Sequence, residues 1–403
     1  MAYLTMLQTR ASMVNASATV LSEACTVAIR YSAIRRQGFI NNSTADYKAE
    51  QYQVIDYPIQ RHRLLKCLSQ VIAIKAAANQ MDDMMVQASE EDLGELHATS
   101  SSLKAYCTTV AATGIEQMRK CCGGAGFLAA SGVGELESFW KGAFEQAEGD
   151  PAVLTLQHSR KLIKTYQAAK KGENVPKAMA YVKLLKDPQF DPIIHARPDS
   201  NFISENNLDG LLQFMRYRAL VVLHEAASRF ETALSEIKNF DLAWTKSMRW
   251  LHAASVCHTI YFILLSSINW TKNIPDIACR ATLEKLVAYY ALSEMEDGYQ
   301  WGGLLTYQDQ QNITIALQMI SDNLRNEMVG VVTAFDISDA TLNSVIGRRD
   351  GNVYEAIYES AIKSPLNIRA DGSRITVPAS LGFMEKYLDK EFLAKGELEI
   401  SKL

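Results

Sequence analysis

Apolar residues recur at the period of an α-helix over most of this chain. Between residues 12 and 36 they fall at steps of three and four, which places them on one face of a single helix. That stripe consists of Val14, Ala18, Leu21, Cys25 and Ile29. The strict alternation typical of half-buried strands is scarce throughout. The periodicity therefore predicts an all-α fold.

Start and stop signals place three more helices in the first half of the chain. Asp56 stands before a Tyr-Pro pair, an N-cap pattern that predicts a helix running towards Met85. Another helix is expected over about 91–121. Asp150 precedes a proline in the same way and begins a helix that should reach Ala169, where two lysines and a glycine supply a stop. Packed antiparallel, these helices would form one bundle.

A proline-rich segment divides the chain into two predicted domains. Residues 187–204 combine three prolines with several Asp and Ser residues, which indicates a linker. The first helical bundle would occupy residues 1–186 and a second residues 205–400. The helices expected in the second span about 205–237, 240–272, 275–297 and 308–334.

Composition excludes several classes of function. With 403 residues the chain has room for two or three domains, and 48% hydrophobic with 21% charged residues is typical of a soluble globular protein. A net charge of −4 gives no electrostatic reason to bind nucleic acid or acidic membranes. The longest apolar run, 260–265, is too short to span a bilayer, so no membrane span is expected. Seven scattered cysteines lack metal-ligand spacing, and we expect reduced thiols and no metal site.

The stretch from Glu116 to Arg160 carries the most suggestive local chemistry. A predicted helix runs into the sequence Cys-Gly-Gly-Ala-Gly-Phe at 122–127, and a loop then reaches Glu148-Gly149-Asp150. Glycines at such density let the backbone turn tightly and approach a ligand closely. Such a glycine turn is more often a helix C-cap than a cofactor site, and a lone carboxylate in such a loop is more often a solvated residue than a base. From local chemistry alone both interpretations stay open.

Several motifs in fixed order resemble one enzyme family. Arg30-Tyr-Ser-Ala-Ile-Arg-Arg-Gln37 comes first, followed by the glycine turn and by Glu-Gly-Asp at 148–150. Two more matching stretches are Leu-Gly-Glu-Leu-His-Ala at 93–98 and Gly-Arg-Arg-Asp-Gly-Asn-Val-Tyr-Glu at 347–355, the latter preceded by Ala-Phe-Asp at 334–336. The series is similar to the C-terminal half of the peroxisomal acyl-CoA oxidases, flavoenzymes of the acyl-CoA dehydrogenase superfamily.

The resemblance assigns roles to individual residues. Glu148 matches the catalytic base, which takes the α-proton of an acyl-CoA while FAD takes the β-hydride. Arg35 and Gln37 match a segment that contacts the FAD pyrophosphate, a task suited to the two-pronged guanidinium. Without the resemblance, an exposed helix C-terminus explains Arg35 as well. Three glycines match the turn that approaches the FAD of the partner subunit: Gly123, Gly124 and Gly126.

The site also departs from the family pattern. Ala147 replaces the aromatic residue that usually precedes the base, which should leave Glu148 less shielded from water. Pro151 replaces the usual Asn after Glu-Gly-Asp, and the loop 141–146 lacks the usual proline. The N-terminal helical region and the β-barrel of the family have no counterpart among these 403 residues. These changes indicate altered specificity or lost activity.

Two functions are therefore expected from the sequence. The first is an FAD-dependent oxidase that converts acyl-CoA to trans-2-enoyl-CoA and reduces O2 to H2O2 in fatty acid β-oxidation. The second is a non-catalytic paralogue that pairs with, and regulates, a complete oxidase subunit. In either case we expect a homodimer or a heterodimer. The final Ser401-Lys402-Leu403 is a peroxisomal import signal read by a receptor, which predicts a peroxisomal location.

Overall fold

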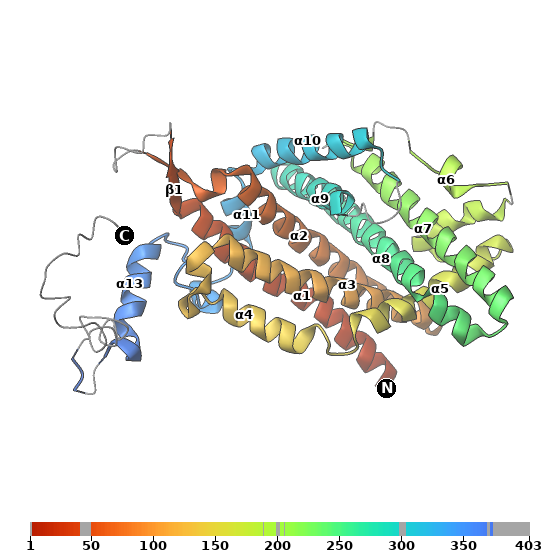
Figure 1. The fold of residues 1–403 in the computed structure, drawn as a ribbon, viewed down its shortest axis with the longest axis horizontal. Coiled ribbons are helices and arrows are strands. Elements are labelled where there is room, and N and C mark those ends of the chain that lie inside the picture. The colour runs from red at the N-terminus through yellow and green to blue at the C-terminus, as the bar shows by residue number, and fades with distance from the viewer. Residues whose placement is uncertain are drawn as a thin grey trace, which may run out of the picture.

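Helices make up nearly all of the structure (Figure 1). The computed structural model describes residues 2–40, 50–187, 189–198, 202–204, 206–297, 304–368 and 371–373. Within these ranges one two-stranded sheet pairs β1 (Arg36–Phe39) with β2 (Gln51–Gln53) in antiparallel fashion. The predicted all-α fold is confirmed. The final Ser401-Lys402-Leu403 lies outside the described residues.

The first half is a bundle of four long helices. α1 (Ala2–Ile34) packs against α2 (Pro58–Gln87) and α3 (Leu93–Cys121), and α3 packs against α5 (Pro151–Lys170). The predicted stripe of α1 is buried along its whole length. Between α3 and α5 lies the short helix α4 (Val133–Phe139), which the periodicity did not predict. It continues into one turn of π-helix at Trp140–Phe144.

Two local features in this half depend on partners outside their own segment, and the first of them contradicts a prediction. Asp56 does not cap α2; the N-cap is Tyr57, and the Asp56 carboxylate instead forms an ion pair with Arg325 at 2.7 Å. α1 ends at Ile34, and the chain then enters β1, so Gln37 lies on a strand. In both cases a partner far along the sequence determines the local conformation.

The second half begins with three long helices. α7 (Leu208–Ile237) and α8 (Phe240–Lys272) form its most extensive helix pair, and α9 (Ile277–Asp297) lies beside them. The helix expected over 308–334 is divided into α10 (Tyr307–Leu324) and α11 (Met328–Ala334). The division coincides with the turn at Arg325, whose guanidinium reaches across to Asp56 in the first half. Two further helices follow, α12 (Asp339–Leu342) and α13 (Val353–Lys363).

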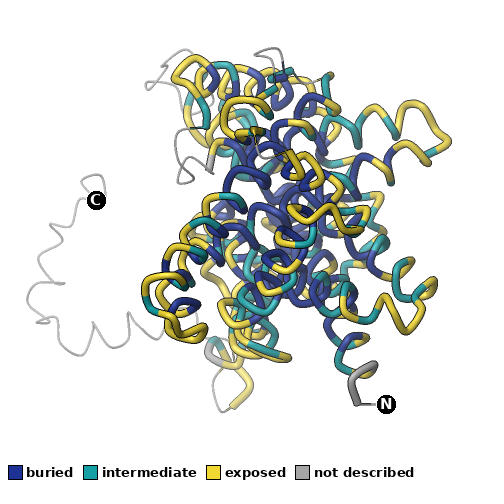
Figure 2. The backbone as a smooth tube through the Cα atoms, turned by 90° about the vertical axis from the view of Figure 1, so that its right-hand side faces the viewer, coloured by how far each residue is buried: buried dark blue, intermediate teal, exposed yellow. Residues whose placement is uncertain are grey.

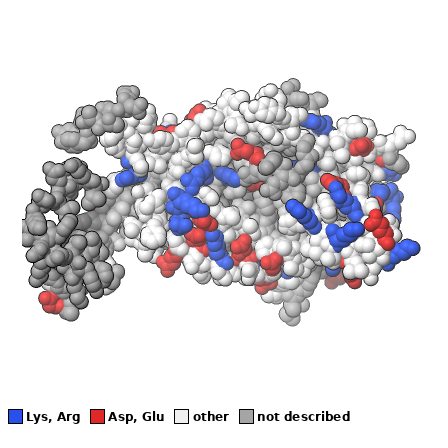
Figure 3. Space-filling view, in the orientation of Figure 1, with Lys and Arg blue, Asp and Glu red and all other residues white. Residues whose placement is uncertain are grey.

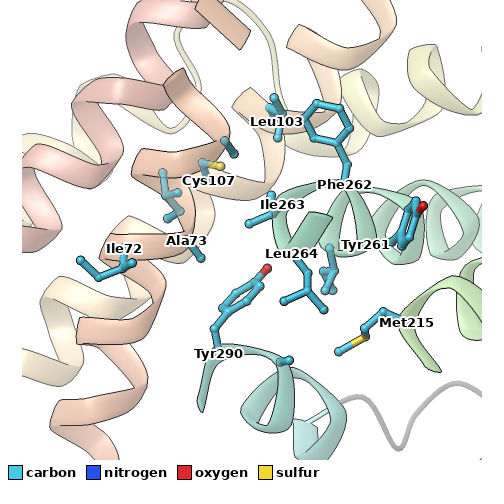
Figure 4. Packing of buried hydrophobic residues seen from close by; sticks show 14 of the residues in the cluster. Ile72, Ala73, Leu103, Cys107, Met215, Tyr261, Phe262, Ile263, Leu264 and Tyr290 are labelled. Carbon is cyan, nitrogen blue, oxygen red and sulfur yellow. The ribbon is translucent and has the colours of Figure 1, made fainter. Parts of the chain in front are cut away.

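The two halves share one hydrophobic core. α8 contacts α2 and α5 as well as α7, and Figure 2 shows the buried segments running continuously through the centre. In Figure 4, Ile263 and Leu264 of α8 lie among Cys107 of α3, Ala73 of α2 and Tyr290 of α9. Buried apolar surface thus fixes how the halves sit against each other.

The segment between the halves is only partly irregular. A 3-10 helix covers Lys177–Lys186, and one helical turn, α6 (Pro192–His195), follows within the predicted linker. The Tyr217 hydroxyl of α7 donates to the Ile193 carbonyl at 3.2 Å, which anchors that turn. The boundary of the predicted linker at 187–204 stays a prediction.

Among the described residues, two helices are long and apolar enough to cross a bilayer. The qualifying segments are Thr5–Ile34 and Phe240–Lys272, and 67% and 83% of their respective apolar windows are buried inside the fold. Core helices of globular proteins show the same combination of length and burial, so these two carry little weight as membrane spans.

Candidate functional site

The loop before α5 places Glu148 in an unusual backbone conformation. The π-helical turn at Trp140–Phe144 is followed by turns that lead to Glu148, where φ is +59°. A left-handed φ is uncommon for a residue with a side chain and costs about 1 kcal/mol. Gly149, with φ +123°, then redirects the chain, and Asp150 caps α5 by accepting from the Ala152 amide at 2.9 Å. The predicted N-cap at Asp150 is confirmed.

Two buried cations hold this loop through its backbone. Arg10 of α1, 5% exposed, donates from Nε and Nη2 to the Glu148 carbonyl at 3.3 and 3.1 Å. Lys104 of α3, with no exposed surface, donates from Nζ to the carbonyls of Glu145 and Gly149 at 2.7 and 2.8 Å. Charge-assisted hydrogen bonds are stronger than neutral ones. Three carbonyls of one loop are therefore fixed by side chains from two other helices.

The Glu148 side chain itself is exposed to solvent. Its backbone carbonyl is held, yet no hydrogen bond or ion pair of its carboxylate is found among the described residues. Ala147 beside it is also exposed and adds no ring that could shield it. The chain therefore holds the backbone of Glu148 in place but leaves its carboxylate exposed to water.

A cavity of about 600 Å³ opens next to the loop. Its walls come from α3, α5 and α8, and Glu145 and Asp150 stand in its lining whereas Glu148 does not. The polar wall groups are satisfied internally: Thr109 donates to Glu145 at 3.1 Å, and Thr155 pairs with His252 at 2.8 Å. The space left over is mainly apolar, in the size range of small-molecule pockets.

The predicted cofactor residues gather at the opposite end of α3. Gln60 of α2 donates to the Ser32 hydroxyl at 3.2 Å and to the Cys121 carbonyl at 2.8 Å, which joins the end of α1 to the glycine turn. Arg35 is partly exposed there, and its guanidinium lies 3.4 Å from the Tyr354 hydroxyl. The Gln37 side chain is exposed, and its carbonyl accepts from the Tyr57 hydroxyl at 2.9 Å.

The three glycines of the turn differ in why the structure requires or tolerates a glycine. A Cβ on Gly126 would overlap the Arg119 carbonyl, so that glycine is required by packing onto the end of α3. Gly123 needs its positive φ of +56°, and a Cβ on Gly123 or Gly124 would meet nothing within 4 Å. The backbone at these two positions therefore faces open space that a ligand could enter.

The structure does not bring Glu148 and these residues together. Lys104, which holds the Glu148 loop, and Cys121 at the glycine turn are seventeen positions apart on α3. At 1.5 Å per residue that separation is about 25 Å. Figure 1 shows the α4–α5 loop near the N-terminal end of α1 and the β1 ribbon at the other end of the molecule. The two ends cannot act on one small reactant within one copy of this chain.

Charged residues between the two ends neutralise one another. Figure 3 shows basic and acidic side chains side by side over the end of α3 and over α4. Lys141 pairs with Glu116 at 2.7 Å and with Glu137 at 3.1 Å, and Arg119 pairs with Glu137 at 2.6 Å. Arg160, on α5, lies with its guanidinium 5.6 Å from the Trp244 ring centre, a packing contact. Among the described residues, no three His, Cys, Asp or Glu side chains converge as they would on a metal ion.

Sequence reasoning missed Arg10 and Lys104. A signal was present, because each charge stands on the apolar stripe of its helix: Arg10 is three residues after Leu7, and Lys104 is three before Cys107. A cation on a buried stripe must find acceptors in the interior. The periodicity alone could not reveal that those acceptors belong to the Glu148 loop.

Comparison with known sequences decides the family. A profile described as "Acyl-CoA oxidase, C-alpha1 domain" matches residues 3–163, and one described as "Acyl-CoA oxidase" matches residues 207–374. The chain belongs to the acyl-CoA oxidase family. It is 32% identical over 376 residues to the peroxisomal acyl-coenzyme A oxidase 1 of Rattus norvegicus and 30% identical to that of Homo sapiens. Each alignment covers 91% of this chain and 56% of the relative.

Solved structures show the same relationship. Acyl-CoA oxidase-1 of Caenorhabditis elegans, complexed with FAD and ATP, superimposes with a TM-score of 0.82 at 27% identity, covering 96% of this chain and 57% of that one. Acyl-CoA oxidase 1 of Arabidopsis thaliana gives 0.82 at 28% identity, covering 97% and 57%. The chain thus spans a little over half the length of the oxidases it matches, and corresponds to their C-terminal helical domains.

Proposed function

We propose that this chain supplies the helical part of an acyl-CoA oxidase active site, in which Glu148 is the base. The reaction removes the α-proton and the β-hydrogen of an acyl-CoA to give a trans-2-enoyl-CoA. FAD, when bound, accepts the β-hydrogen as hydride and passes two electrons to O2, which becomes H2O2. The observation that carries the proposal is the fixed left-handed conformation of Glu148, held by buried Arg10.

Glu148 has the freedom a base needs. Its carboxylate makes no hydrogen bond within the described residues, so none of those residues occupies the oxygen that would take up a proton. Its exposure means that another protein surface or the substrate must exclude water before it can work at full strength. The apolar cavity beside the loop gives the acyl tail a place to lie, with Asp150 and Glu145 at its lining.

The residues at the glycine end fit a dinucleotide. Open backbone at Gly123 and Gly124 admits close approach, and Arg35 offers a guanidinium to phosphate oxygens from the same end of the fold. Gln37 has an exposed amide beside them. Because this end lies about 25 Å from the Glu148 loop along α3, we assign the two ends to two different flavins, one on each side of a dimer.

A flavin titration tests the proposal. The purified protein, alone and mixed with a complete oxidase subunit, is reconstituted with FAD and freed of unbound cofactor. We expect retained flavin absorbance and peroxide release on adding acyl-CoA. Two results would contradict the oxidase assignment. The first is that the protein is colourless both alone and with the complete subunit. The second is that it is yellow but releases no peroxide with short, medium or long acyl chains.

A second function, that of a non-catalytic dimer partner, rests on the exposed carboxylate of Glu148 and the wet loop around it. This partner would lend Arg35 and the open glycines to the flavin of a complete subunit. It predicts that the chain raises flavin retention by that subunit without adding peroxide production of its own. Because relatives at about 30% identity are peroxisomal oxidases, and because of the final Ser401-Lys402-Leu403, we place either function in the peroxisome.

A further inference from the structure

Lys104 contacts the chain on both sides of Glu148. Its Nζ donates to the Glu145 carbonyl at 2.7 Å and to the Gly149 carbonyl at 2.8 Å. Three residues lie between those contacts, and the last of them is Glu148, with φ +59°. Lys104 itself lies wholly inside the fold, on the face of α3 that points towards α1 and the loop.

The charge of Lys104 is compensated in an unusual way. Buried lysines are normally paired with a carboxylate, because an unpaired buried charge costs several kcal/mol. Here both acceptors are backbone carbonyls at the end of the π-helical segment and its turns, where peptide groups lack helical partners. The ammonium therefore stabilises one arrangement of those peptide groups, and that arrangement includes the Glu148 backbone.

Charged groups surround Lys104 from each neighbouring element. Arg10 faces it from α1, and Glu145, Glu148 and Asp150 face it from the loop. Burial, and secondarily Arg10, lower the pKa of Lys104 from its usual 10.5 to about 8, against the opposing pull of the three carboxylates. A neutral amine can still donate two hydrogen bonds, but neutral hydrogen bonds are roughly half as strong as charge-assisted ones.

We propose that Lys104 is the positioning residue that holds Glu148 in its working conformation, and that this hold weakens when the ammonium loses its proton. The inference rests on the proposed role of Glu148 as base. Lys104 touches neither substrate nor cofactor in this scheme; it acts through the two carbonyls. Loss of the hold lets the Glu148 peptide relax out of its left-handed φ and moves the carboxylate away from the substrate α-carbon.

The experiment compares three variants with the wild type. Lys104→Met removes the donors and keeps the length of the side chain; Lys104→Arg keeps the charge at all accessible pH values. Lys75→Met is the matched control, because Lys75 is an exposed lysine that bridges α2 to Asn15 of α1. Each protein is measured by amide hydrogen exchange at Ala147 and Gly149, corrected for intrinsic exchange, and by kcat and KM for acyl-CoA from pH 6 to 10.

The exchange measurement decides the positioning role without requiring activity. The amides of Ala147 and Gly149 donate to carbonyls within the same loop, so their protection reports its order. We expect wild-type protection to fall as pH rises through about 8, to be low at every pH in Lys104→Met, and to stay constant in Lys104→Arg. Equal protection in the wild type and Lys104→Met, or no change across pH 8, overturns the inference. If Lys104→Met fails to fold, the wild-type pH series decides alone.

The kinetic measurement separates this inference from the proposed function. In an active holoenzyme we expect Lys104→Met to lower kcat on the order of 10- to 100-fold with KM within about threefold, because misplacing a reacting group costs turnover before binding. The alkaline fall in kcat should be absent from Lys104→Arg, and Lys75→Met should match the wild type. An inactive wild type would refute the proposed function while the exchange data still test Lys104. An active Lys104→Met with wild-type kcat would refute Lys104 alone.

Discussion

The two ends of α3 are built on opposite principles. At the Glu148 end, two buried cationic side chains, Arg10 and Lys104, donate hydrogen bonds to three backbone carbonyls of the loop. At the glycine end, Gly124 opens onto empty space, and Phe127 exposes 85% of its surface. Exposed aromatic surface and open glycines indicate contact with another body. The backbone of one end is held by side chains of this chain, whereas the glycine end is open to something outside it.

The largest expected effect is a loss of folding stability at acid pH. It should arise from buried histidines where α5 meets α8. His258 pairs with the Tyr181 hydroxyl at 2.7 Å, and burial lowers its pKa to about 4. His158 pairs with Ser255 at 2.8 Å, and its pKa is also lowered by burial. The unfolded chain binds these protons near pH 6.5, so between pH 6.5 and 4 it binds more protons than the folded chain, and stability falls as pH falls.

Between pH 7 and pH 4.5 the fall in stability should be about 2 kcal/mol for His258 alone, from its shift in pKa. Urea unfolding at pH 7 and pH 4.5 measures it. His258→Gln, which can still accept from Tyr181, should remove a matching part of the pH dependence. An unchanged pH dependence in that variant would show that His258 does not cause the loss of stability in acid.

A pair of arginine variants should show the next largest difference. Arg10→Met removes the donor to the Glu148 carbonyl and one donor to the Ser101 hydroxyl, which still donates to the His97 carbonyl, and should lower the free energy of unfolding by about 2 kcal/mol. Arg35→Met, at the glycine end, should change it by less than about 0.5 kcal/mol, because Arg35 is partly exposed and makes one long hydrogen bond. Equal losses measured by denaturant unfolding would erase the distinction between the ends.

The smallest stability difference should separate two neighbouring glycines. Gly126→Ala forces a methyl group against the Arg119 carbonyl and should cost about 1–2 kcal/mol. Gly124→Ala places its methyl group in open space, so stability should hold while flavin retention by the complex declines. Thermal unfolding and bound-flavin absorbance measure the two quantities separately. A stable Gly126→Ala would show that this turn is looser than the structure describes.

Helix positions were predictable from the sequence where the periodicity is strong. The span expected over 240–272 matches α8 residue for residue, and the cap at Asp150 follows from chemistry within two residues. The predicted cap at Asp56 failed because Arg325, which is far along the sequence, pairs with its carboxylate. A single sequence carries no direct record of such partners.

The candidate site was predictable only in part. The family resemblance placed Glu148 and the glycine turn, and the structure shows them at separate ends, which spacing along the sequence could not reveal. Lys104 was overlooked because a lysine in a serine-rich stretch resembles a solvated residue. Only its burial and its two carbonyl acceptors show its relation to the loop.

The most direct measurement is peroxide production by flavin-loaded Glu148→Gln, with Glu145→Gln as its neighbour control. Removing the base while preserving shape should lower kcat on the order of 10²- to 10⁴-fold. The same change at Glu145, whose carboxylate accepts from Thr109, should lower it by less than about threefold, as expected for a group outside the chemistry. An unchanged rate in Glu148→Gln, or a greater loss in Glu145→Gln, would contradict the assignment of Glu148 as the base.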